Sequence, residues 1–421
     1  MKRKHLTNFL YEEHTMGKCG SIALDIKTYF AGKNQPTHPN VIAFDRPWHG
    51  YRYYMAYTPY PYANGCEENP CVAVSNDLIH WVSPRERVNP IATSEELACD
   101  ELKDSHLLYC KVHDRLELWY LGRLDSTLAE GGQLHCLRKV SKDGCSWSNY
   151  EVMYSFTEFN LVSESVLYDG AYRFWGIRHT AEDIGLYYMQ SPDGLHWTEL
   201  VKCEVPQAAL TDMWHGTVIF QEGKYHFVWV GNSGIHRQRV YYADSSDGIH
   251  FSQPHIILEN DTGWEYLYRP CPLKAEGQWY CYYGVIRSDG KWLISMSKGP
   301  VIQKLRGITA DELGTISQAA DALISSGRKL RIKKLVGDAE KLFTPRLLLL
   351  APLLILLRLL QFSPLAVWGL AVVFGTACSF VRISRKKAVQ RGLLMGTISA
   401  AAASFAAEIL TQLLQMIGNL L

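Results

Sequence analysis

Short runs of alternating hydrophobic and polar residues, rich in aromatic side chains, follow one another through the first 300 residues of the chain. One stretch reads GTVIFQEG, KYHFVWVG and RVYYADSS, and the stretch before it reads SVLYDG, AYRFWGI and LYYMQS. A two-residue period with Gly or Asp between the runs is typical of β-strands joined by tight turns. We therefore predict antiparallel meanders that contain three strands each.

A turn motif follows each set of three strands and defines a repeat. The motif is Ser-x-Asp-Gly-x-x-aromatic, and it recurs after 50 to 66 residues, with a shortened copy at 288–290. The longer copies begin at Ser75, Ser141, Ser191 and Ser245. Asp-Gly suits a tight turn because Gly accepts a positive φ and Asp can bond its own backbone. Five units in residues 20–300 predict an all-β, five-bladed β-propeller, with a strand near 20–30 closing the ring.

Long apolar runs replace this pattern beyond residue 345. They lie at about 346–362, 364–382 and 392–420, and each is close to the ~20 residues that cross a bilayer. Basic clusters flank the first two runs, so the positive-inside rule places both clusters, and the propeller, in the cytoplasm. We expect a C-terminal α-helical membrane region with the lipid bilayer as a partner. A buried helical bundle is the alternative, and the third run could instead lie along the membrane surface.

The charge distribution separates the two parts of the chain. Residues 301–421 hold 15 Lys+Arg and 6 Asp+Glu, which leaves 28 and 36 for residues 1–300. The mildly acidic first part argues against nucleic-acid binding. Residues 301–345 read as a basic amphipathic helical linker, and residues 1–19 as an N-terminal extension. The 11 cysteines form no complete disulfide framework, and we read no secretion signal, so a reducing compartment is expected.

The repeat resembles the five-bladed propeller glycoside hydrolases, among them families 43, 32 and 130. The likeness spans about residues 20–300 and rests on the blade number, the Asp-Gly-aromatic turns, the segment His38-Pro39-Asn40-Val41 and the segment Glu68-Asn69-Pro70. It implies a carbohydrate or glycoconjugate substrate and acid/base cleavage of a glycosidic bond by two carboxyl groups. In that family a first-blade Asp is the base or nucleophile, a second-blade Asp orients, and a third-blade Glu is the acid.

Candidate site residues follow from the topology of a propeller, because the innermost strands begin, and the second strands end, at one mouth of the central channel. The resemblance assigns Glu164 as the acid and Asp104 as the orienting group. His38 stands where the family has Asp, so His38 or Glu68 takes the base position. Candidate substrate-binding residues at the same mouth are Asn40, Arg123, Arg178, Trp214, His215, Arg269 and Arg287.

Several alternatives remain open from the sequence alone. The four arginines suit an anionic sugar, such as a uronate or a sugar phosphate, unless each merely neutralises a nearby carboxylate. Besides a membrane-anchored glycosidase, the chain fits a catalytically inactive glycan-binding propeller in envelope polysaccharide assembly, or a phosphate-dependent glycosyl transfer enzyme. We assign no metal site and no cofactor, since the closest cysteines, Cys66 and Cys71, lack the accompanying ligands of a zinc site.

Overall fold

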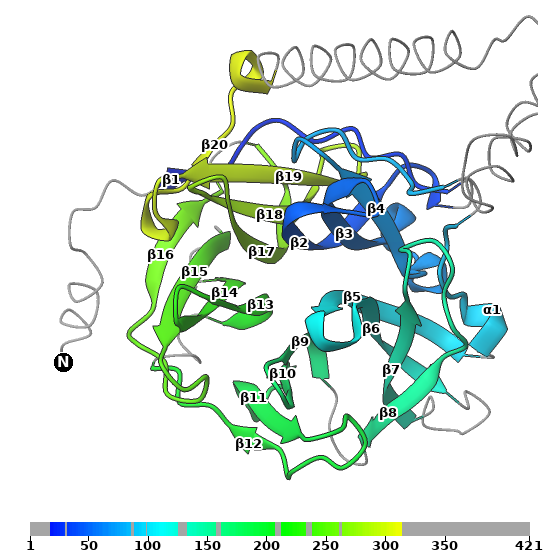
Figure 1. Cartoon of the computed structure of the whole chain (residues 1–421). Coiled ribbons are helices and arrows are strands. Elements are labelled where there is room, and N and C mark those ends of the chain that lie inside the picture. The colour runs from blue at the N-terminus through cyan, green and yellow to red at the C-terminus, as the bar shows by residue number, and fades with distance from the viewer. Residues whose placement is uncertain are drawn as a thin grey trace, which may run out of the picture. The chain divides into compact units, whose positions relative to one another are not determined.

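The computed structural model describes residues 17–313, apart from 30–31, 86–87, 98, 125–132, 157–160, 207–211, 233–237 and 261–262. All of these residues lie in the first of the chain's two compact units, Met1–Asp321. Five sheets stand around a central axis (Figure 1). The five-bladed, all-β propeller predicted from the repeats is thus confirmed.

Each blade is an antiparallel meander that starts nearest the axis. The first blade contains β2 (Pro36–Trp48), β3 (Tyr51–Pro59) and β4 (Cys71–Ser75). The second contains β5 (Cys99–Cys110), β6 (Arg115–Leu124), β7 (Gln133–Ser141) and β8 (Glu151–Phe156). The third contains β9 (Leu161–Tyr168), β10 (Tyr172–His179), β11 (Ile184–Ser191) and β12 (Val201–Lys202).

The remaining two blades follow the same plan. The fourth contains β13 (Met213–Gln221), β14 (Lys224–Asn232), β15 (Gln238–Ser245) and β16 (His255–Glu259). The fifth contains β17 (Tyr266–Ala275), β18 (Gln278–Ile286), β19 (Trp292–Gly299) and β20 (Arg306–Gly307). The connections include the helix α1 (Ser94–Leu97) and short 3₁₀ helices at Pro61–Ala63, Gly65–Glu67, Lys111–His113 and Ile302–Lys304. The five first strands contact one another in a closed ring.

The N-terminal segment joins the outer edges of the fourth and fifth blades. Its strand β1 (Gly17–Lys18) pairs in parallel with β16, and Ala23 forms one antiparallel bridge to Ser295 of β19. The strand expected near residues 20–30 is therefore reduced to a single bridge. The reason is that β20 already pairs with Ser297 and Lys298 on the same edge of β19, so the fifth blade extends past residue 300.

A bulge interrupts every innermost strand near its start. In four blades, two bulge residues of the innermost strand lie opposite one residue of the second strand. In the fourth blade, β13 has one extra residue that lies opposite no residue of β14. The first bulge residue of those four strands has a left-handed φ of 33° to 56°, in His38, Asp104, Ser163 and Arg269. That backbone costs a residue with a Cβ about 1–2 kcal/mol, and bulges commonly re-aim side chains beside functional sites.

The bulges also explain why the alternating pattern covers only part of each innermost strand. In the first blade the run VIAF begins at Val41, whereas β2 begins at Pro36. In the second blade the run HLLYC begins at His106, whereas β5 begins at Cys99. An extra residue reverses the inward and outward sides of a strand, so the period-two pattern ends at the bulge although the hydrogen-bonded ladder continues.

Side chains just after the bulges tie each blade to the next. Equivalent positions in four of the blades supply these bonds, and all four bonds join a side chain to the backbone of the neighbouring innermost strand. They are Leu107 N to Asn40 Oδ1 (2.8 Å), His106 Nε2 to Val166 O (3.0 Å), Val218 N to Ser165 Oγ (3.0 Å) and Val41 N to Cys271 Sγ (3.3 Å). These bonds hold the starts of the innermost strands at one level.

The Ser-x-Asp-Gly repeats form side-chain-capped turns, as the copy at Ser245 illustrates. Ser245 Oγ accepts hydrogen bonds from the N–H groups of Asp247 and Gly248, at 3.3 and 2.9 Å. Asp247 Oδ1 then accepts from the N–H groups of Ile249 and His250, both at 2.9 Å. The bond from His250 is the main reason why the pKa of Asp247 lies below its usual range. The repeated aspartates therefore serve the turns.

The open edge of the three-stranded first blade is covered by separate contacts. Val82 exchanges two backbone hydrogen bonds with Val74, at 2.8 and 3.0 Å. The amide side chain of Asn89 accepts from Val72 N at 2.9 Å and donates to Val72 O at 2.8 Å. Pro70 O accepts from Ile91 N at 2.8 Å. Together these contacts replace the fourth strand that the other blades possess.

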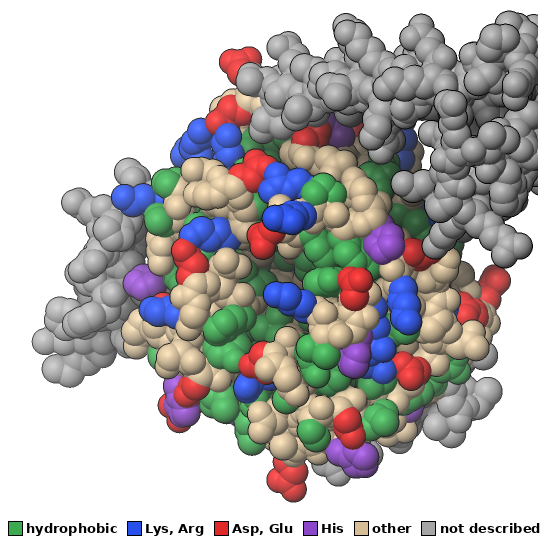
Figure 2. All heavy atoms as spheres, in the orientation of Figure 1, with side chains coloured by type: hydrophobic (Ala, Val, Ile, Leu, Met, Phe, Trp, Pro, Cys, Tyr) green, Lys and Arg blue, Asp and Glu red, His purple; other side chains and the backbone are tan. Residues whose placement is uncertain are grey.

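Charged side chains of both signs are interspersed over the face of the propeller shown in Figure 2, without a large basic patch among the residues described there. This mixed surface gives a nucleic-acid backbone no continuous cationic track on that face. The nine cysteines whose side chains the structure describes are free thiols.

No helix in the described part of the chain has the length and apolar character that a membrane crossing requires. The runs at 346–362, 364–382 and 392–420 lie outside the described residues. Of the predicted linker, residues 301–307 belong to the fifth blade, and a helix begins at Ala310. Thr309 and Glu312 cap it reciprocally, since Glu312 N donates to Thr309 Oγ1 (3.2 Å) and Thr309 N donates to Glu312 Oε2 (3.0 Å).

Replacing Gly248 by Ala will destabilise the propeller more than the same change at Gly223. Both glycines have a left-handed φ, of 81° and 78°, but a Cβ at Gly248 would lie 2.8 Å from Trp175 Cζ2 whereas nothing lies within 4 Å at Gly223. We expect Gly223→Ala to lower the unfolding free energy by about 1–2 kcal/mol, and Gly248→Ala by more. Thermal unfolding of the two variants followed by near-UV circular dichroism tests this, and equal midpoints would contradict it.

Candidate functional site

The bulges bring one side chain from each blade to the axis at the same level. These five side chains occupy equivalent positions in the innermost strands, and each is at most 3% exposed. They are His38, Asp104, Ser163, His215 and Arg269. Because the repeat is structural, the same backbone position presents four kinds of chemical group in the five blades, with an imidazole in two of them. The site is therefore assembled from five segments that are distant in sequence.

Arg269 links the second, third and fifth blades through its guanidinium group. Its Nη1 donates to Asp104 Oδ1 at 3.1 Å, and its Nη2 donates to the backbone oxygen of Glu164 at 2.9 Å. Burial alone would raise the pKa of Asp104, but the neighbouring His215 and the Arg269 guanidinium hold it well below its usual range. Asp104 is therefore a carboxylate at neutral pH.

His38 is oriented by a buried carboxylate. Its Nδ1 lies 2.7 Å from Glu68 Oε1 and 2.7 Å from Thr58 Oγ1, and the Thr58 hydroxyl donates to the same carboxylate at 3.4 Å. Since an ionised carboxylate only accepts hydrogen bonds, Nδ1 carries the ring proton. The lone pair of the neutral ring then resides on Nε2, which lies 3.9 Å from Asp104 Oδ1.

His215 faces Asp104 from the fourth blade. Its Nδ1 lies 3.5 Å from Asp104 Oδ1 and 2.6 Å from Ser163 Oγ, and Ser163 N donates to Asp104 Oδ2 at 3.0 Å. Burial lowers the pKa of His215 to about 4, so the imidazole is neutral at pH 7. The Tyr268 ring packs against His215 and His38, with centroids 4.1 and 4.9 Å apart.

His38, Asp104 and His215 together could hold a divalent metal ion. One ligand atom from each residue lies within 4.8 Å of the other two. Two neutral imidazoles and one carboxylate form a donor set that suits Zn²⁺, Mn²⁺ or Fe²⁺. The Glu68 carboxylate on the far nitrogen of His38 is the usual outer partner of a metal-binding histidine.

The buried charges at this level favour a cation as well. Two buried carboxyl groups, those of Glu68 and Asp104, both lie within 4 Å of His38, and the Arg269 guanidinium pairs with one of them, Asp104. Sequence analysis assigned no metal, because the three ligands are separated by 66 and 111 residues and form no spacing motif. Their equivalent positions in a repeat were the available signal.

Glu164 lies beside the trio but points elsewhere. It is the second residue of its bulge and is fully buried, and neither carboxyl oxygen has a hydrogen-bond partner among the described residues. Its Oε1 lies 3.8 Å from Arg269 Nη2. Burial raises the pKa of Glu164 well above its usual range and so favours the protonated form. The protonated form is the one that the predicted role of acid requires.

The other predicted binding residues do not gather around the axis. Asn40 is 2% exposed and belongs to the ring of inter-blade bonds. Arg178 pairs with Asp183 at 3.4 Å, and Arg287 donates from Nε to Asp289 at 2.9 Å near the surface. Arg123 lies on β6 opposite Leu134. Of these arginines, Arg269 contacts Asp104 of the trio, whereas Arg178 and Arg287 pair with aspartates close to them in sequence.

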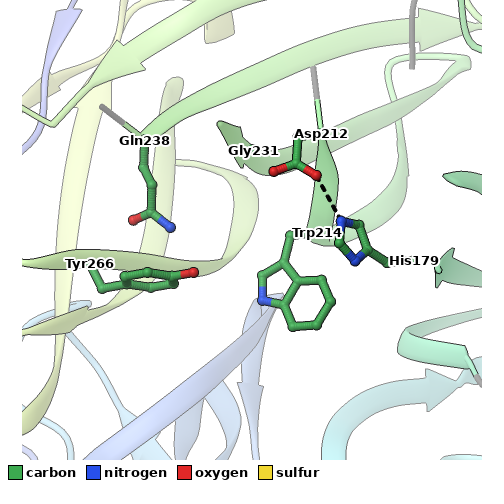
Figure 3. A pocket seen from close by; sticks show the side chains of 6 residues that line it. All are labelled: His179, Asp212, Trp214, Gly231, Gln238 and Tyr266. Atoms are coloured by element: carbon green, nitrogen blue, oxygen red, sulfur yellow. Dashed lines mark hydrogen bonds and ion pairs between the residues drawn. The ribbon is translucent and has the colours of Figure 1, made fainter. Parts of the chain in front are cut away.

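A cavity of about 180 Å³ adjoins the trio (Figure 3). It is lined by His179, Asp212, Trp214, Gly231, Gln238 and Tyr266. His179 Nε2 lies 2.7 Å from Asp212 Oδ1, and the ring centroid of Trp214 is 5.0 Å from that of His215. Trp214, His179 and Asp212 lie at the mouth that the topology predicted. Gln238 and Tyr266 were missed, because strand ends alone do not indicate which neighbouring loops close a cavity.

Comparisons with known proteins agree with the fold. No protein-family model matches the chain. A curated relative, the A type blood N-acetyl-α-D-galactosamine deacetylase of Flavonifractor plautii, is 22% identical over 317 residues, which cover 61% of this chain and 40% of the relative. The chain thus spans well under half of the length of that protein.

Two solved structures share the architecture. The N-acetylgalactosamine deacetylase from F. plautii, crystallised with blood group B trisaccharide, has a TM-score of 0.55 at 17% identity and covers 67% of this chain and 94% of its own. A thermostable family-43 glycoside hydrolase has a TM-score of 0.51 at 14% identity and covers 70% of this chain and 97% of its own. The protein therefore has the five-bladed, glycoside hydrolase-like propeller that the sequence resemblance implied.

Proposed function

We propose that the protein is a metal-dependent hydrolase that removes an N-acyl group, such as acetyl, from a sugar of a glycoconjugate. The observation that carries this proposal is the convergence of His38, Asp104 and His215 at equivalent positions of three blades. The site has an imidazole where a propeller glycosidase has its first carboxylate. A neutral imidazole stabilises an oxocarbenium ion less well than a carboxylate does. The exchange therefore favours metal-assisted attack on a carbonyl over glycosidic bond cleavage.

Hydrolysis of the amide would transfer the acyl group to water, break the carbonyl–nitrogen bond and leave a carboxylic acid and a free amine. A divalent cation held by the trio would supply Lewis-acid polarisation of the carbonyl oxygen and an activated water. Glu68 keeps the proton on Nδ1 of His38, so the lone pair of Nε2 remains available to bind a metal ion. Arg269 keeps Asp104 ionised. Glu164, whose pKa is raised by burial, is a proton source for the leaving amine.

The relationship to the F. plautii protein supports this choice of chemistry. That relative is a deacetylase of N-acetyl-α-D-galactosamine, and it shares the propeller fold with this chain. The similarity covers 40% of the relative's length. We therefore carry over the reaction class and the sugar substrate to this propeller, and leave the identity of the glycan open.

Glycosidic bond cleavage is a second candidate, favoured by one observation. Glu164 is buried and its pKa is raised, as in the general acid of a glycosidase. In that mechanism Glu164 would protonate the leaving oxygen, Asp104 would orient it, and His38 or Glu68 would serve the opposite side of the ring. His38 is not a carboxylate, and Glu68 Oε1 already bonds to His38 and Thr58, so we rank this reaction second.

We also propose that residues 346–420 anchor the protein in a membrane, with the propeller on the cytoplasmic side. The three apolar runs and their flanking basic clusters support this anchoring. After cell lysis the full chain should sediment with membranes and resist extraction by carbonate, whereas a truncation after residue 345 should not. Recovery of the full chain in the soluble fraction would contradict the proposal.

The purified full chain should retain about one equivalent of a divalent metal such as Zn²⁺ or Mn²⁺. Asp104→Asn and His215→Ala should each lose it, because they remove a ligand. His226→Gln is the matched control, since His226 is also buried but bonds to Tyr242 and to the Gln221 backbone. Metal content after dialysis, measured by plasma mass spectrometry, tests this, and equal content in all four proteins would refute the metal site.

Release of acetate from N-acetylhexosaminides should depend on that metal. We expect activity to vanish with a chelator, to return with added metal, and to fall at least about 100-fold in Asp104→Asn. Turnover of aryl glycosides by the wild type and by Glu164→Gln, measured in parallel, distinguishes glycosidic bond cleavage from deacylation. Cleavage of the glycoside that survives chelation would favour the glycosidase. If neither reaction occurs but the sugars bind, the propeller is a binding module.

A further inference from the structure

We propose that the cavity beside Trp214 binds one neutral sugar ring and discriminates against sugars that carry a carboxylate or sulfate. The inference rests on the proposed function in that it takes the substrate to be a sugar. It goes further by naming the subsite and its charge selectivity. It also reverses the expectation of an anionic substrate that the distribution of arginines suggested.

The size of the cavity limits its occupant. Its volume of about 180 Å³ is below the range of about 300–1,000 Å³ typical of pockets that enclose drug-sized ligands. A single ring therefore fits, whereas an oligosaccharide must extend outside. The walls come from β10, β14 and the starts of β13, β15 and β17, so ordered strands hold them in place.

The walls combine aromatic faces with polar groups at their edges. Figure 3 shows Trp214 and Tyr266 on one side of the cavity, with the Gln238 amide and the Asp212 carboxylate across from them. Gln238 Oε1 accepts a hydrogen bond from Leu267 N, which fixes the amide, and the Gln238 side chain also hydrogen-bonds Tyr266 at the edge of the cavity. Flat apolar faces and edge hydrogen-bonding groups match the C–H and hydroxyl faces of a sugar.

The charge of the lining determines what is excluded. Among the six lining residues, Asp212 is the acid, and neither a lysine nor an arginine is present. The Asp212 side chain is 39% exposed and is paired with His179 at 2.7 Å. Arg178 precedes His179 on β10 but pairs with Asp183 instead. Within the described lining, an anionic sugar would therefore meet a carboxylate without a guanidinium to offset it.

The position of the cavity links the sugar to the trio. The Trp214 ring lies between the two regions, with its centroid 4.5 Å from His179 and 5.0 Å from His215. Tyr266, two residues before Tyr268, approaches from the fifth blade, and Tyr268 packs on His215 at 4.1 Å. A ring held against Trp214 therefore places its substituents one side chain away from His215.

Isothermal titration of the full chain with N-acetylgalactosamine and with galacturonate tests the proposal. We expect N-acetylgalactosamine to bind at least tenfold more tightly than galacturonate. Trp214→Ala should weaken N-acetylgalactosamine binding about tenfold through lost stacking. Asp212→Asn should reduce the preference for N-acetylgalactosamine over galacturonate to less than about threefold, because it removes the negative charge and keeps the shape of the side chain.

Two control variants isolate the cavity. Asp169→Asn makes the same change at an exposed carboxylate that pairs with Arg173, and Tyr150→Ala removes an aromatic ring that is 38% exposed elsewhere on the surface. Both should retain wild-type affinities. Equal or tighter binding of galacturonate by the wild type, or unchanged affinity in Trp214→Ala, would overturn the inference.

The titrations also separate this inference from the proposed function. Removal of the metal by a chelator leaves the side chains of the trio and the cavity lining in place, so sugar binding should persist in the chelated protein while acetate release is lost. Trp214-dependent binding without any acetate release would sustain the subsite and refute the deacylase. Acetate release that is insensitive to Trp214→Ala would sustain the deacylase and refute the subsite.

Discussion

The buried ion pair between Asp104 and Arg269 is the interaction on which the site depends. The guanidinium is fully buried and reaches from the fifth blade to the second and third. Removing one partner of such a pair leaves an uncompensated buried charge, at a cost of about 3–5 kcal/mol. Because the pair fixes the Asp104 carboxylate at the axis, the imidazoles of His38 and His215 have a common negative group to face.

The backbone bulges give this arrangement its geometry. Each innermost strand would otherwise alternate its side chains regularly, and the residues at the level of Asp104 would not all turn toward the axis. The left-handed residues cost the fold free energy, and the inter-blade bonds of Asn40, His106, Ser165 and Cys271 lie just beyond them. Strained backbone of this kind persists where surrounding contacts fix it, as they do here.

Much of the fold could be predicted from the sequence, because hydrophobic alternation and the Asp-Gly turns repeat in every blade. The same topology assigned His38, Asp104, His215 and Arg269 to one mouth, and their side chains lie close together in the structure. It could not predict that His38, Asp104 and His215 converge, because strand order gives the face of a propeller but not the direction of a side chain at a bulge. Arg178 and Arg287 show the same limit, since both turn toward local acidic partners.

The covered edge of the first blade has a consequence for how the molecule behaves in a crowded cell. A blade that lacks its fourth strand offers unpaired backbone groups on which a second chain could add a strand, the usual first step of edge-to-edge aggregation. Here the outward backbone groups of Val72 and Val74 are both occupied, one by the Asn89 side chain and the other by Val82. The propeller can therefore lack a strand and still resist self-association at that edge.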